Sequence, residues 1–538
     1  MSDPIEASTV GELVRKAAAT FGNAEAVVGE GTRLTFTELD ARSRALARRL
    51  LGRGVAKRTH VGVSFGNNPD FLVSLLAVSR IGAVAVPIST FAPGRELLRL
   101  IRYGDLAAVL TTQQVVGGDQ VDRLTAAIPG LADTKSTVLT LPAAPNLRWI
   151  EFAHSDDDPP AWVTLPDDDG IAAPLDDALL DAVEEDVVGT DVALMIHTSG
   201  TTSDPKGVPH THDTVCFRVR YLAERMQYRP GDRTYTSQVL FWIGGLTMSF
   251  LTSIAAGATS VWCERFDADQ VLPLIEHERI TRLAIYPHQV AQLLAHPEFA
   301  STDRSTLRIA DPRLAPGGDT TVILTPEGHR MGLGMSETFG PYSWGSGGTN
   351  VIAPVQDVQP GLEIRVVDEH NQPVGDGTTG EIVLRGRCVT PGYYKRPRDV
   401  GFDTDGWFHT GDRGLVEGAS IHFLGRMTEM IKTAGANVSP AEVIDALLAL
   451  DDIREAYVLP LPDRVRGELV SAAVVLDEAS DLDAETITAE LKKDLSPFKV
   501  PTAIAIFRSE EIPWTPTFKV RRHELTEMIV QRAAGAGP

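Results

Sequence analysis

The sequence predicts an α/β protein: a large N-terminal domain of layered α/β subdomains with a small antiparallel β section, followed by a small C-terminal α+β domain. Helical and strand signals alternate through the first hundred residues, as in parallel α/β layers. Near residue 361 the pattern changes to strand, turn, strand. The chain has 538 residues, more than the ~250–300 at which a single core stops growing, so we expect more than one domain.

The spacing of apolar residues places the elements of the N-terminal part. Residues 39–51 have helical spacing with arginines on the opposite face, and HVGVSF at 60–65 is typical of a strand. A helix over residues 70–80 and a short strand over 83–88 follow. Three further strands are predicted at 192–196, 259–263 and 282–285.

The C-terminal third has a different texture. LEIRVVD, QPVGDGTTG and EIVLRG, between residues 361 and 386, predict two antiparallel strands joined by a turn rich in Gly. After Arg426 we expect a helix over 440–450, the strands AYVLP and SAAVVL, a helix over 483–495 and the strand AIAIF. These about 110 residues are long enough for a separate domain.

The charge balance excludes some partners. The chain has 50 Lys and Arg against 72 Asp and Glu, a formal net charge of −22, so neither a nucleic acid nor an anionic membrane surface is expected as the main partner. The stretch 151–191 holds 14 of the acidic residues and no Lys or Arg. Such composition favours a solvated loop or connector.

Cysteine usage and hydropathy indicate the compartment. Cys216, Cys263 and Cys388 are far apart and have no metal-like spacing, which fits a reducing cytoplasm. The N-terminus has no basic and apolar segments of a signal peptide. No apolar run approaches the ~18–20 residues of a membrane span, so no integral membrane segment is expected.

The most informative segment is TSGTTSDPKGV at residues 198–208, directly after a predicted strand. Small hydroxyl and Gly residues after a strand let the backbone approach an anion closely, and Lys206 adds a positive charge. The segment lacks the Gly-Lys-Ser/Thr triplet of a P-loop. Taken alone, a flexible polar turn is the other interpretation.

Further segments follow in order: GLGMSE (332–337), GWFHTGD (406–412), GRMTEMIKTAGANVSPAEV (425–443) and TPTFKVRRHEL (515–525). Together with residues 198–208 they resemble the motifs of the adenylate-forming superfamily of acyl-CoA synthetases, adenylation domains and luciferases. The likeness covers nearly the whole chain. It implies an N-terminal ATP- and acid-binding domain at 1–425 and a mobile C-terminal domain at 426–538, with a hinge near 426–428.

The resemblance also implies roles for single residues. Lys519 and Glu337 would be catalytic, and Glu337 with Thr201 would hold Mg²⁺. Gly435 would line the CoA channel and Thr428 would be the hinge. ATP and AMP would be bound by Thr198, Ser199, Gly200, Thr201, Thr202, Lys206, Gly334, Met335, Ser336, Asp412 and Arg426. The acyl pocket would include Trp242, Gly244, Gly245 and Leu246, which favours an apolar acid.

The chemistry of an acyl adenylate requires such residue types. A carboxylate must approach the α-phosphate of ATP, and since both are anions the barrier is largely electrostatic. Glu337 offers the oxygen ligand that Mg²⁺ prefers, and Lys519 would meet the charge that shifts between the reacting groups. Asp412 can accept from both ribose hydroxyls. For Lys519 a plain basic surface patch, and for Gly435 an ordinary turn, are the competing interpretations.

The sequence departs from the family pattern at several positions. Ser203 stands where the phosphate loop usually has Gly, Leu333 where an aromatic residue is usual, and Phe518 where Gly is common before the lysine. Trp242 replaces a frequent His. These changes affect adenine contacts and the loop rather than any acid or base.

We therefore expect an ATP-dependent carboxylic acid–CoA ligase, a cytoplasmic enzyme that forms an acyl-AMP and then a thioester. Its substrates would be ATP, CoA and a carboxylic acid, with Mg²⁺ as cofactor, and an oligomer is left open. One alternative is an acyl-AMP ligase that loads a carrier protein. The other alternative is a nucleotide-binding pseudoenzyme, which is suggested by the departures from the family pattern at Ser203, Leu333 and Phe518.

Overall fold

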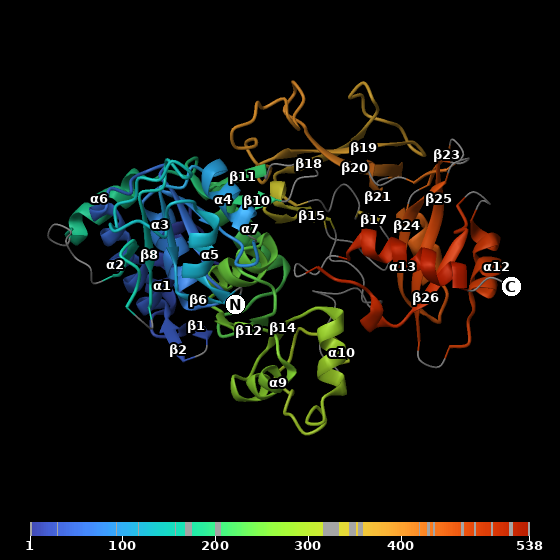
Figure 1. The fold of residues 1–538 in the computed structure, drawn as a ribbon, viewed down its shortest axis with the longest axis horizontal. Helices are drawn as coiled ribbons and strands as arrows, with labels where there is room; N and C mark the ends of the chain where they lie inside the picture. Colours follow the sequence, from blue (N-terminus) through green and yellow to red (C-terminus); the bar gives the residue numbers. More distant parts are fainter. Residues whose placement is uncertain are drawn as a thin grey trace. The chain divides into compact units, whose positions relative to one another are not determined.

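The computed structural model describes residues 3–29, 31–92, 94–116, 118–155, 158–166, 175–198, 206–311, 313–315, 333–343, 351–352, 359–418, 420–427, 431–433, 436–438, 440–463, 467–477, 480–495, 499–515 and 520–535. The chain folds into two compact units (Figure 1). Unit 1 comprises Met1–Tyr342 and Gly386–Val400, and unit 2 comprises Ser343–Arg385 and Gly401–Pro538.

Unit 1 is built on a seven-stranded sheet in the order β11-β10-β4-β3-β5-β8-β9. All neighbours are parallel except β10 and β11, which pair antiparallel at one edge. This confirms the predicted α/β class. The strands are β3 (His60–Ser64), β4 (Val84–Pro87), β5 (Ala108–Thr111), β8 (Trp149–Phe152), β9 (Val163–Thr164), β10 (Val192–Thr198) and β11 (Lys206–Thr211).

A second, five-stranded sheet of unit 1 has the order β14-β12-β13-β1-β2. Its strands are parallel except for β2, which forms an antiparallel edge beside β1. The predicted strands near residues 259 and 282 are therefore confirmed as part of this sheet. Its strands are β1 (Glu25–Gly29), β2 (Thr32–Thr35), β12 (Arg233–Thr236), β13 (Thr259–Val261) and β14 (Arg282–Ala284), and a small hairpin is formed by β6 (Gln114–Val115) and β7 (Gly118–Asp119).

The helices of unit 1 begin where the sequence offers capping residues. Thr35 and Glu38 form a capping box at the start of α2, and Asn68 caps α3, whose first residue is Pro69. The predicted helices over 39–51 and 70–80 lie inside these two. The helices are α1 (Val10–Phe21), α2 (Phe36–Gly52), α3 (Pro69–Arg80), α4 (Gly94–Tyr103), α5 (Gln120–Ala127), α6 (Asp177–Asp186), α7 (His212–Arg225), the π-helix η1 (Gly244–Leu251), α8 (Thr252–Ala256), α9 (Ala268–His277) and α10 (Pro287–Ala295).

The core of unit 1 lies on both faces of the seven-stranded sheet. Successive strand residues point to opposite faces, so Ala85 packs into one apolar cluster while Val84 and Val86 pack into the other. Burial on both faces explains why the strands at 60–65 and 83–88 read as continuous apolar runs instead of alternating ones. Figure 1 shows helices α1, α2 and α3 together beside this sheet.

Part of the acidic stretch 151–191 is buried, which the sequence did not predict. Glu151 on β8 is only 3% exposed, and its carboxylate pairs with Arg49 at 2.5 Å and with Arg53. Glu184 on α6 is buried beside Arg80 at 3.2 Å, and burial raises the pKa of its carboxyl. The expected solvated connector is therefore wrong for these segments, because their carboxylates balance arginines of α2 and α3.

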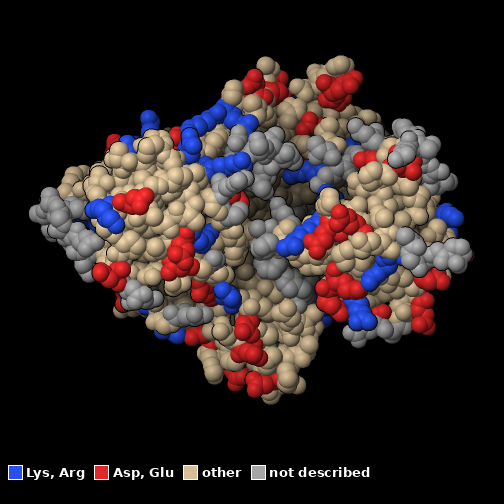
Figure 2. Space-filling view, in the orientation of Figure 1, with Lys and Arg blue, Asp and Glu red and all other residues tan. Residues whose placement is uncertain are grey.

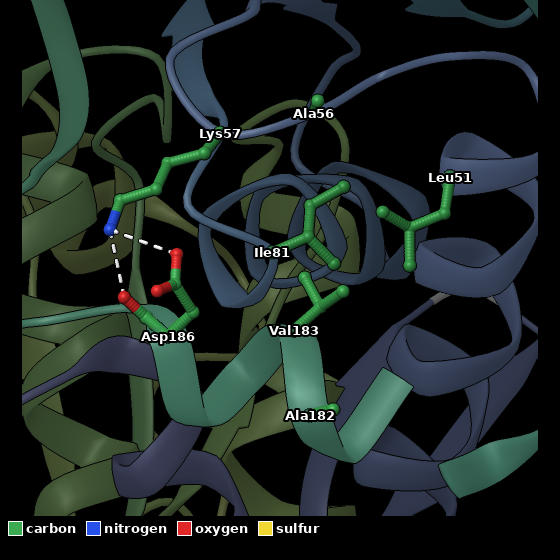
Figure 3. A pocket seen from close by; sticks show the side chains of 7 residues that line it. All are labelled: Leu51, Ala56, Lys57, Ile81, Ala182, Val183 and Asp186. Atoms are coloured by element: carbon green, nitrogen blue, oxygen red, sulfur yellow. Dashed lines mark hydrogen bonds and ion pairs between the residues drawn. The ribbon is translucent and has the colours of Figure 1, made fainter. Parts of the chain in front are cut away.

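An open hollow of about 330 Å³ lies where the ends of α2 and α3 meet α6 (Figure 3). Its wall is mostly apolar, with Leu51, Ile81 and Val183. At its edge the Lys57 ammonium donates to the carbonyl of Asp186 at 2.8 Å and to its carboxylate at 3.3 Å.

Figure 2 shows acidic side chains in separate clusters with basic side chains between them, on the face that is drawn. No helix among the described residues is both long and apolar enough to span a bilayer.

Unit 2 contains two sheets. The first is antiparallel in the order β17-β21-β20-β19-β18, and the second has the order β23-β22-β25-β24 with β26 parallel to β25. They confirm the antiparallel section and the C-terminal α+β elements. The elements are β17 (Val351–Ile352), β18 (Leu362–Val367), β19 (Thr379–Gly386), β20 (Phe408–Glu417), β21 (Ser420–Arg426), β22 (Ile431–Thr433), β23 (Ala436–Val438), α11 (Pro440–Leu448), β24 (Ile453–Asp463), β25 (Gly467–Leu476), α12 (Ala484–Asp494), β26 (Ala503–Phe507) and α13 (Arg522–Gly535).

The domain boundary at residues 425 and 426 stays a prediction. The antiparallel sheet belongs to the same compact unit as the C-terminal residues. The predicted boundary instead concerns the point at which the C-terminal domain would turn against the rest of the chain. The predicted hinge residue Thr428 lies outside the described residues.

Three buried histidines predict a loss of stability in mild acid. Burial lowers the pKa of His197 and His212 to about 4 and that of His210 to about 3. Because the unfolded chain takes up these protons near pH ~6.5, stability is complete above that pH and declines as the pH falls toward the folded values, by about 2 kcal/mol per histidine at pH ~5. The midpoint of thermal unfolding should therefore fall between about pH 7 and about pH 5.

His212→Asn should flatten this pH dependence by about one proton. The His212 Nδ1 accepts from the Val10 N–H at 3.2 Å, and an Asn oxygen can replace that acceptor without titrating. The exposed His370 supplies the control variant His370→Asn, which should keep the wild-type slope. An unchanged slope in His212→Asn would contradict the prediction.

Candidate active site

The ends of β10 and β11 bring two predicted phosphate-binding residues together. In the antiparallel pairing of these strands, Thr198 lies directly opposite Lys206. The two residues that flank 199–205 in the sequence are therefore paired with each other. Ser199, Gly200, Thr201 and Thr202 lie outside the described residues.

Glu337 sits in a tight hairpin of unit 1. Strands β15 (Gly334–Met335) and β16 (Gly340–Pro341) pair antiparallel, and the 3₁₀ turn η2 (Ser336–Thr338) connects them. A Cβ at Gly334 would lie 2.9 Å from the Cα of Pro341, so only glycine fits there. Phe339 has φ +51, a left-handed conformation that a bulky residue adopts only when its surroundings enforce it.

Hydrogen bonds enforce the shape of this hairpin. Arg218, a buried residue of α7, donates from Nη1 to the carbonyl of Pro341 at 2.7 Å and from Nη2 to the carbonyl of Thr338. The Thr338 hydroxyl donates to the carbonyl of Gly340 at 2.7 Å. The Thr390 N–H donates to the Glu337 carbonyl at 2.7 Å. The backbone that carries Glu337 is thereby held by two other segments of unit 1.

Tyr393 links Glu337 to Lys206. Its hydroxyl donates to Oε1 of Glu337 at 2.8 Å, and the Lys206 Nζ lies 5.0 Å from the centre of its ring. The next residue, Tyr394, donates its N–H to the carbonyl of Gly207 at 2.9 Å. A predicted phosphate-loop lysine and the predicted metal carboxylate therefore share one aromatic neighbour.

Sequence reasoning missed Tyr393 and Arg218. A signal for Tyr393 was the aromatic pair in PGYYKRP, which lies between two prolines and begins four residues after the strand EIVLRG. A signal for Arg218 was its position on the apolar face of a helix, between Val215 and Leu222, where charged residues are rarely found without a partner.

His210 packs against the hairpin at Phe339. Its ring lies 4.7 Å from the ring of Phe339, and burial lowers its pKa to about 3. The imidazole is therefore neutral near pH ~7. It packs against the turn instead of supplying charge.

In unit 2, Asp412 and Arg426 face each other across β20 and β21. The Arg426 Nε lies 2.8 Å from Oδ1 of Asp412, and the Arg426 Nη1 donates to the carbonyl of Thr410 at 3.0 Å. Asp412 is only 4% exposed, and Gly411 beside it has φ +72. The predicted ribose-binding carboxylate is thus held next to its predicted arginine neighbour.

The predicted acyl-pocket residues lie at the start of the π-helix η1. A Cβ at Gly245 would lie 2.4 Å from the carbonyl oxygen of Val239, and one at Gly244 would lie 2.7 Å from Oε1 of Gln238. Leu246 is buried in the core, and Trp242 packs against that core while half-buried. Gly245 is therefore required for close packing of η1 on the preceding backbone, whereas at Gly244 the Gln238 side chain could move, and the pocket assignment stays a prediction.

The remaining predicted residues lie outside the described part of the chain. These are the catalytic Lys519, the channel residue Gly435 and the hinge residue Thr428. Their neighbours are described: Thr433 of β22 pairs with Ala436 of β23, and Val520 bridges to Trp514.

The carboxylate chemistry of the hairpin fits a magnesium ion that is held partly by substrate. Among the described residues, no group of three or more His, Cys, Asp or Glu side chains is arranged to hold a metal. Mg²⁺ is commonly bound through one or two carboxylates together with phosphate oxygens and water, and rarely by an all-protein cage. A single carboxylate such as Glu337, oriented by Tyr393, meets that requirement.

Comparisons with known proteins give the family. A family model described as AMP-binding enzyme matches residues 14–394, and one described as AMP-binding enzyme C-terminal domain matches residues 442–519. The indoleacetate–CoA ligase of Aromatoleum aromaticum is 29% identical over 512 residues, which cover 93% of this chain and 94% of that protein.

Two more similar proteins span almost the full length. The 3-[(3aS,4S,7aS)-7a-methyl-1,5-dioxo-octahydro-1H-inden-4-yl]propanoyl:CoA ligase of Rhodococcus jostii is 29% identical over 539 residues, covering 97% of this chain and 98% of that protein. The crystal structure of ATP-bound MatB from Rhodopseudomonas palustris has a TM-score of 0.73 and 23% identity, over 97% of this chain and 99% of that chain, and so shares the fold. Because the first family model spans well over half of the sequence, this chain belongs to the AMP-binding enzyme family.

Proposed function

We propose that this protein is an ATP-dependent carboxylic acid–CoA ligase. The observation that carries the proposal is the convergence of Lys206 and Glu337 on Tyr393 in a chain of this family. It unites a cation at the end of the phosphate loop with a carboxylate suited to a metal. The names of the relatives from Aromatoleum and Rhodococcus, both acid–CoA ligases, agree with it.

The proposed reaction has two steps. In the first, a carboxylate oxygen of the acid attacks the α-phosphorus of ATP, and the bond from that phosphorus to pyrophosphate breaks. In the second, the thiol sulfur of CoA attacks the acyl carbon, the bond to AMP breaks, and the thiol proton is released. Acid, ATP and CoA thus yield acyl-CoA, AMP, pyrophosphate and a proton.

The residues of unit 1 would bind the phosphates. Lys206 offers a positive charge, and the backbone and hydroxyls of Thr198, Ser199, Gly200, Thr201 and Thr202 offer hydrogen bonds. Glu337 and Thr201 would hold Mg²⁺, which when bound neutralises phosphate charge and so lowers the electrostatic barrier. Gly334, Met335 and Ser336 would line the nucleotide site next to it.

The residues of unit 2 would bind the ribose and stabilise the charge that shifts between the reacting carboxylate and the α-phosphate. Asp412, which pairs with Arg426, would accept from ribose hydroxyls. We propose that Lys519 donates to the reacting carboxylate and α-phosphate in the first step. We also propose a domain of residues 426–538 that turns at Thr428, so that Gly435 lines the CoA channel in the second step.

Finer proposals concern the chemical nature of the acid and the cellular location of the protein. An apolar body of the acid is supported by the apolar surroundings of Trp242. A cytoplasmic location is supported by the three cysteines, which are all buried and free. An oligomeric assembly is left open.

Product analysis tests the acceptor. With ATP, Mg²⁺, CoA and a broad panel of acids, we expect AMP and a CoA thioester in equal amounts. Acyl-AMP that accumulates without thioester, and is consumed only by a carrier protein, would contradict the CoA ligase and favour the carrier-loading alternative. No pyrophosphate release with any acid would favour a nucleotide-binding role without catalysis.

Lys519→Ala should slow the first step. Removal of one well-placed charged donor typically costs a factor of ~10²–10³ in rate. The measurement is acid-dependent exchange between pyrophosphate and ATP, with the neighbouring Arg521→Ala as control. If Lys519→Ala and wild type exchange equally, Lys519 has no part in adenylation.

Tyr393→Phe should weaken the use of Mg²⁺. The hydroxyl of Tyr393 orients the Glu337 carboxylate, and loss of such an outer partner typically costs ~10–100-fold in metal affinity. The magnesium concentration for half-maximal adenylation should rise by about tenfold. Tyr394→Phe is the matched control, because the Tyr394 hydroxyl donates to Asp105 at 2.6 Å. An equal rise in both variants, or none in Tyr393→Phe, would contradict this role.

A further inference from the structure

A second cavity in unit 1 is small, with a mostly apolar surface and several buried polar side chains in its lining. Its volume is about 20 Å³, enough for one water-sized group. It lies between the end of α7, the ends of the neighbouring strands β12 and β14, and the helix η1. Its lining includes Tyr228, Thr234, Gln238, Met248, Ser249 and Arg282.

Arg282 brings a buried cation to this cavity. The residue is only 1% exposed, and the centre of its guanidinium lies 3.8 Å from the centre of the Tyr228 ring. Its Nη1 donates to the carbonyl of Gln227 at 3.4 Å. Its Nε and Nη2 have no hydrogen-bond partner among the described residues, and buried guanidinium groups are normally paired.

The nearest carboxylate does not meet this need. Asp232 lies 4.0 Å from the Arg282 Nη1, which is beyond a hydrogen bond. The same carboxylate already accepts from Arg308 Nη2 at 2.6 Å and from the Thr281 hydroxyl at 2.9 Å. One carboxylate therefore serves two arginines, and the cluster keeps a net positive charge.

Two more polar atoms around the cavity make no hydrogen bond of ordinary geometry with a described residue, although the Tyr228 hydroxyl, which donates to the Met248 carbonyl at 2.8 Å, lies near one of them. They are the hydroxyl oxygen of Thr234, which is buried, and Oε1 of Gln238. Together with Arg282, these residues contribute two guanidinium nitrogens, one hydroxyl and one amide oxygen to the lining of the cavity. This is the lining of a site that recognises an oxygen, since a hydrogen bond to a charged donor is stronger than a neutral one.

Gln238 connects the cavity with the predicted acyl pocket. Its Oε1 lies 2.7 Å from the position of a Cβ on Gly244, the first residue of η1. Met248 and Ser249 of the same helix line the cavity. The cavity therefore adjoins the residues that were assigned to the acyl group, and Gln238 contacts both.

We propose that the acid carries an oxygen-bearing group remote from its reacting carboxylate, and that this oxygen accepts hydrogen bonds from Arg282 and Thr234 in the cavity. The group is an oxo, a hydroxyl or a second carboxylate oxygen. This inference rests on the proposed ligase function, which it deepens by naming the substrate class. The body of the acid between its two ends remains apolar.

Acids of equal skeleton test the proposal. The pairs are hexanoate against 5-oxohexanoate, 6-hydroxyhexanoate and hexanedioate, and 3-phenylpropanoate against 3-(4-hydroxyphenyl)propanoate. A site that hydrogen-bonds its substrate discriminates strongly against the analogue without the polar group, so kcat/KM for the best oxygenated acid should exceed that of its parent by about 10²-fold. Ratios within about twofold for every skeleton would overturn the proposal.

The isosteric variant Thr234→Val shows whether the cavity causes the selectivity. It should lower the oxygenated-to-parent ratio by about tenfold. The control is Ser260→Ala, because Ser260 is a buried hydroxyl residue paired with Thr234 on the neighbouring strand β13 and does not line the cavity. Gln238→Leu is a second variant, which should lower the ratio for the hydroxy acids alone, because Oε1 of Gln238 can accept from a hydroxyl but cannot donate to an oxo or carboxylate oxygen. An unchanged ratio in both cavity variants would overturn the assignment.

Calorimetric titration of the same acids separates failure of this inference from failure of the ligase function. If no acid supports adenylation, the ligase function is wrong. Oxygenated acids that still bind more tightly than their parents, and lose that advantage in Thr234→Val, would then support the oxygen site alone. Equal binding of both members of each pair, or binding of neither, would overturn it.

Discussion

The hydrogen bond from the Tyr393 hydroxyl to Glu337 is the contact through which the candidate site of unit 1 is assembled. It joins the segment Gly386–Val400 to the hairpin of β15 and β16, and the ring of Tyr393 also meets Lys206 at the start of β11. The hairpin is a costly structure, since Phe339 adopts a left-handed conformation. Arg218 offsets that cost by donating to two of its carbonyls. Glu337 can face a polyanionic substrate only because these separate segments hold it in one orientation.

Buried arginines contact several segments of unit 1. Their pairing with carboxylates explains how a protein with a negative net charge can act on anionic substrates. Arg80 meets Glu184 and Arg53 meets Glu151, so a part of the acidic stretch serves as internal counter-charge. Arg218 spends its donors on backbone carbonyls. Arg282 differs because two of its nitrogens lack partners among the described residues. A net charge of −22 therefore describes the whole sequence and says little about the local field at Lys206, where a phosphate would bind.

The apolar acid expected from residues 242–246 becomes more specific in the structure. Gly245 is required by the close approach of η1 to Val239, because a side chain there would collide with the backbone, and Gly244 lies next to the side chain of Gln238. The wide turns of a π-helix often occur at functional sites, and here η1 places Met248 and Ser249 at a small cavity that Arg282 also lines. An acid with an apolar body and one remote oxygen reconciles the apolar surroundings of Trp242 with the unpaired donors of Arg282.

The sequence alone determined the α/β class, the order of the elements and the ATP-related motifs, because periodicity and capping are local properties of the chain. The strand at 60–65 and the helix at 440–450 follow from short segments. Only the tertiary structure decided which distant residues meet. Three features depend on contacts between segments more than thirty residues apart: the contact of Tyr393 with Glu337, the support of the hairpin by Arg218, and the position of Arg282 in the lining of a cavity beside η1. Such contacts leave no periodic trace in the sequence, since they arise only when separate elements pack against one another.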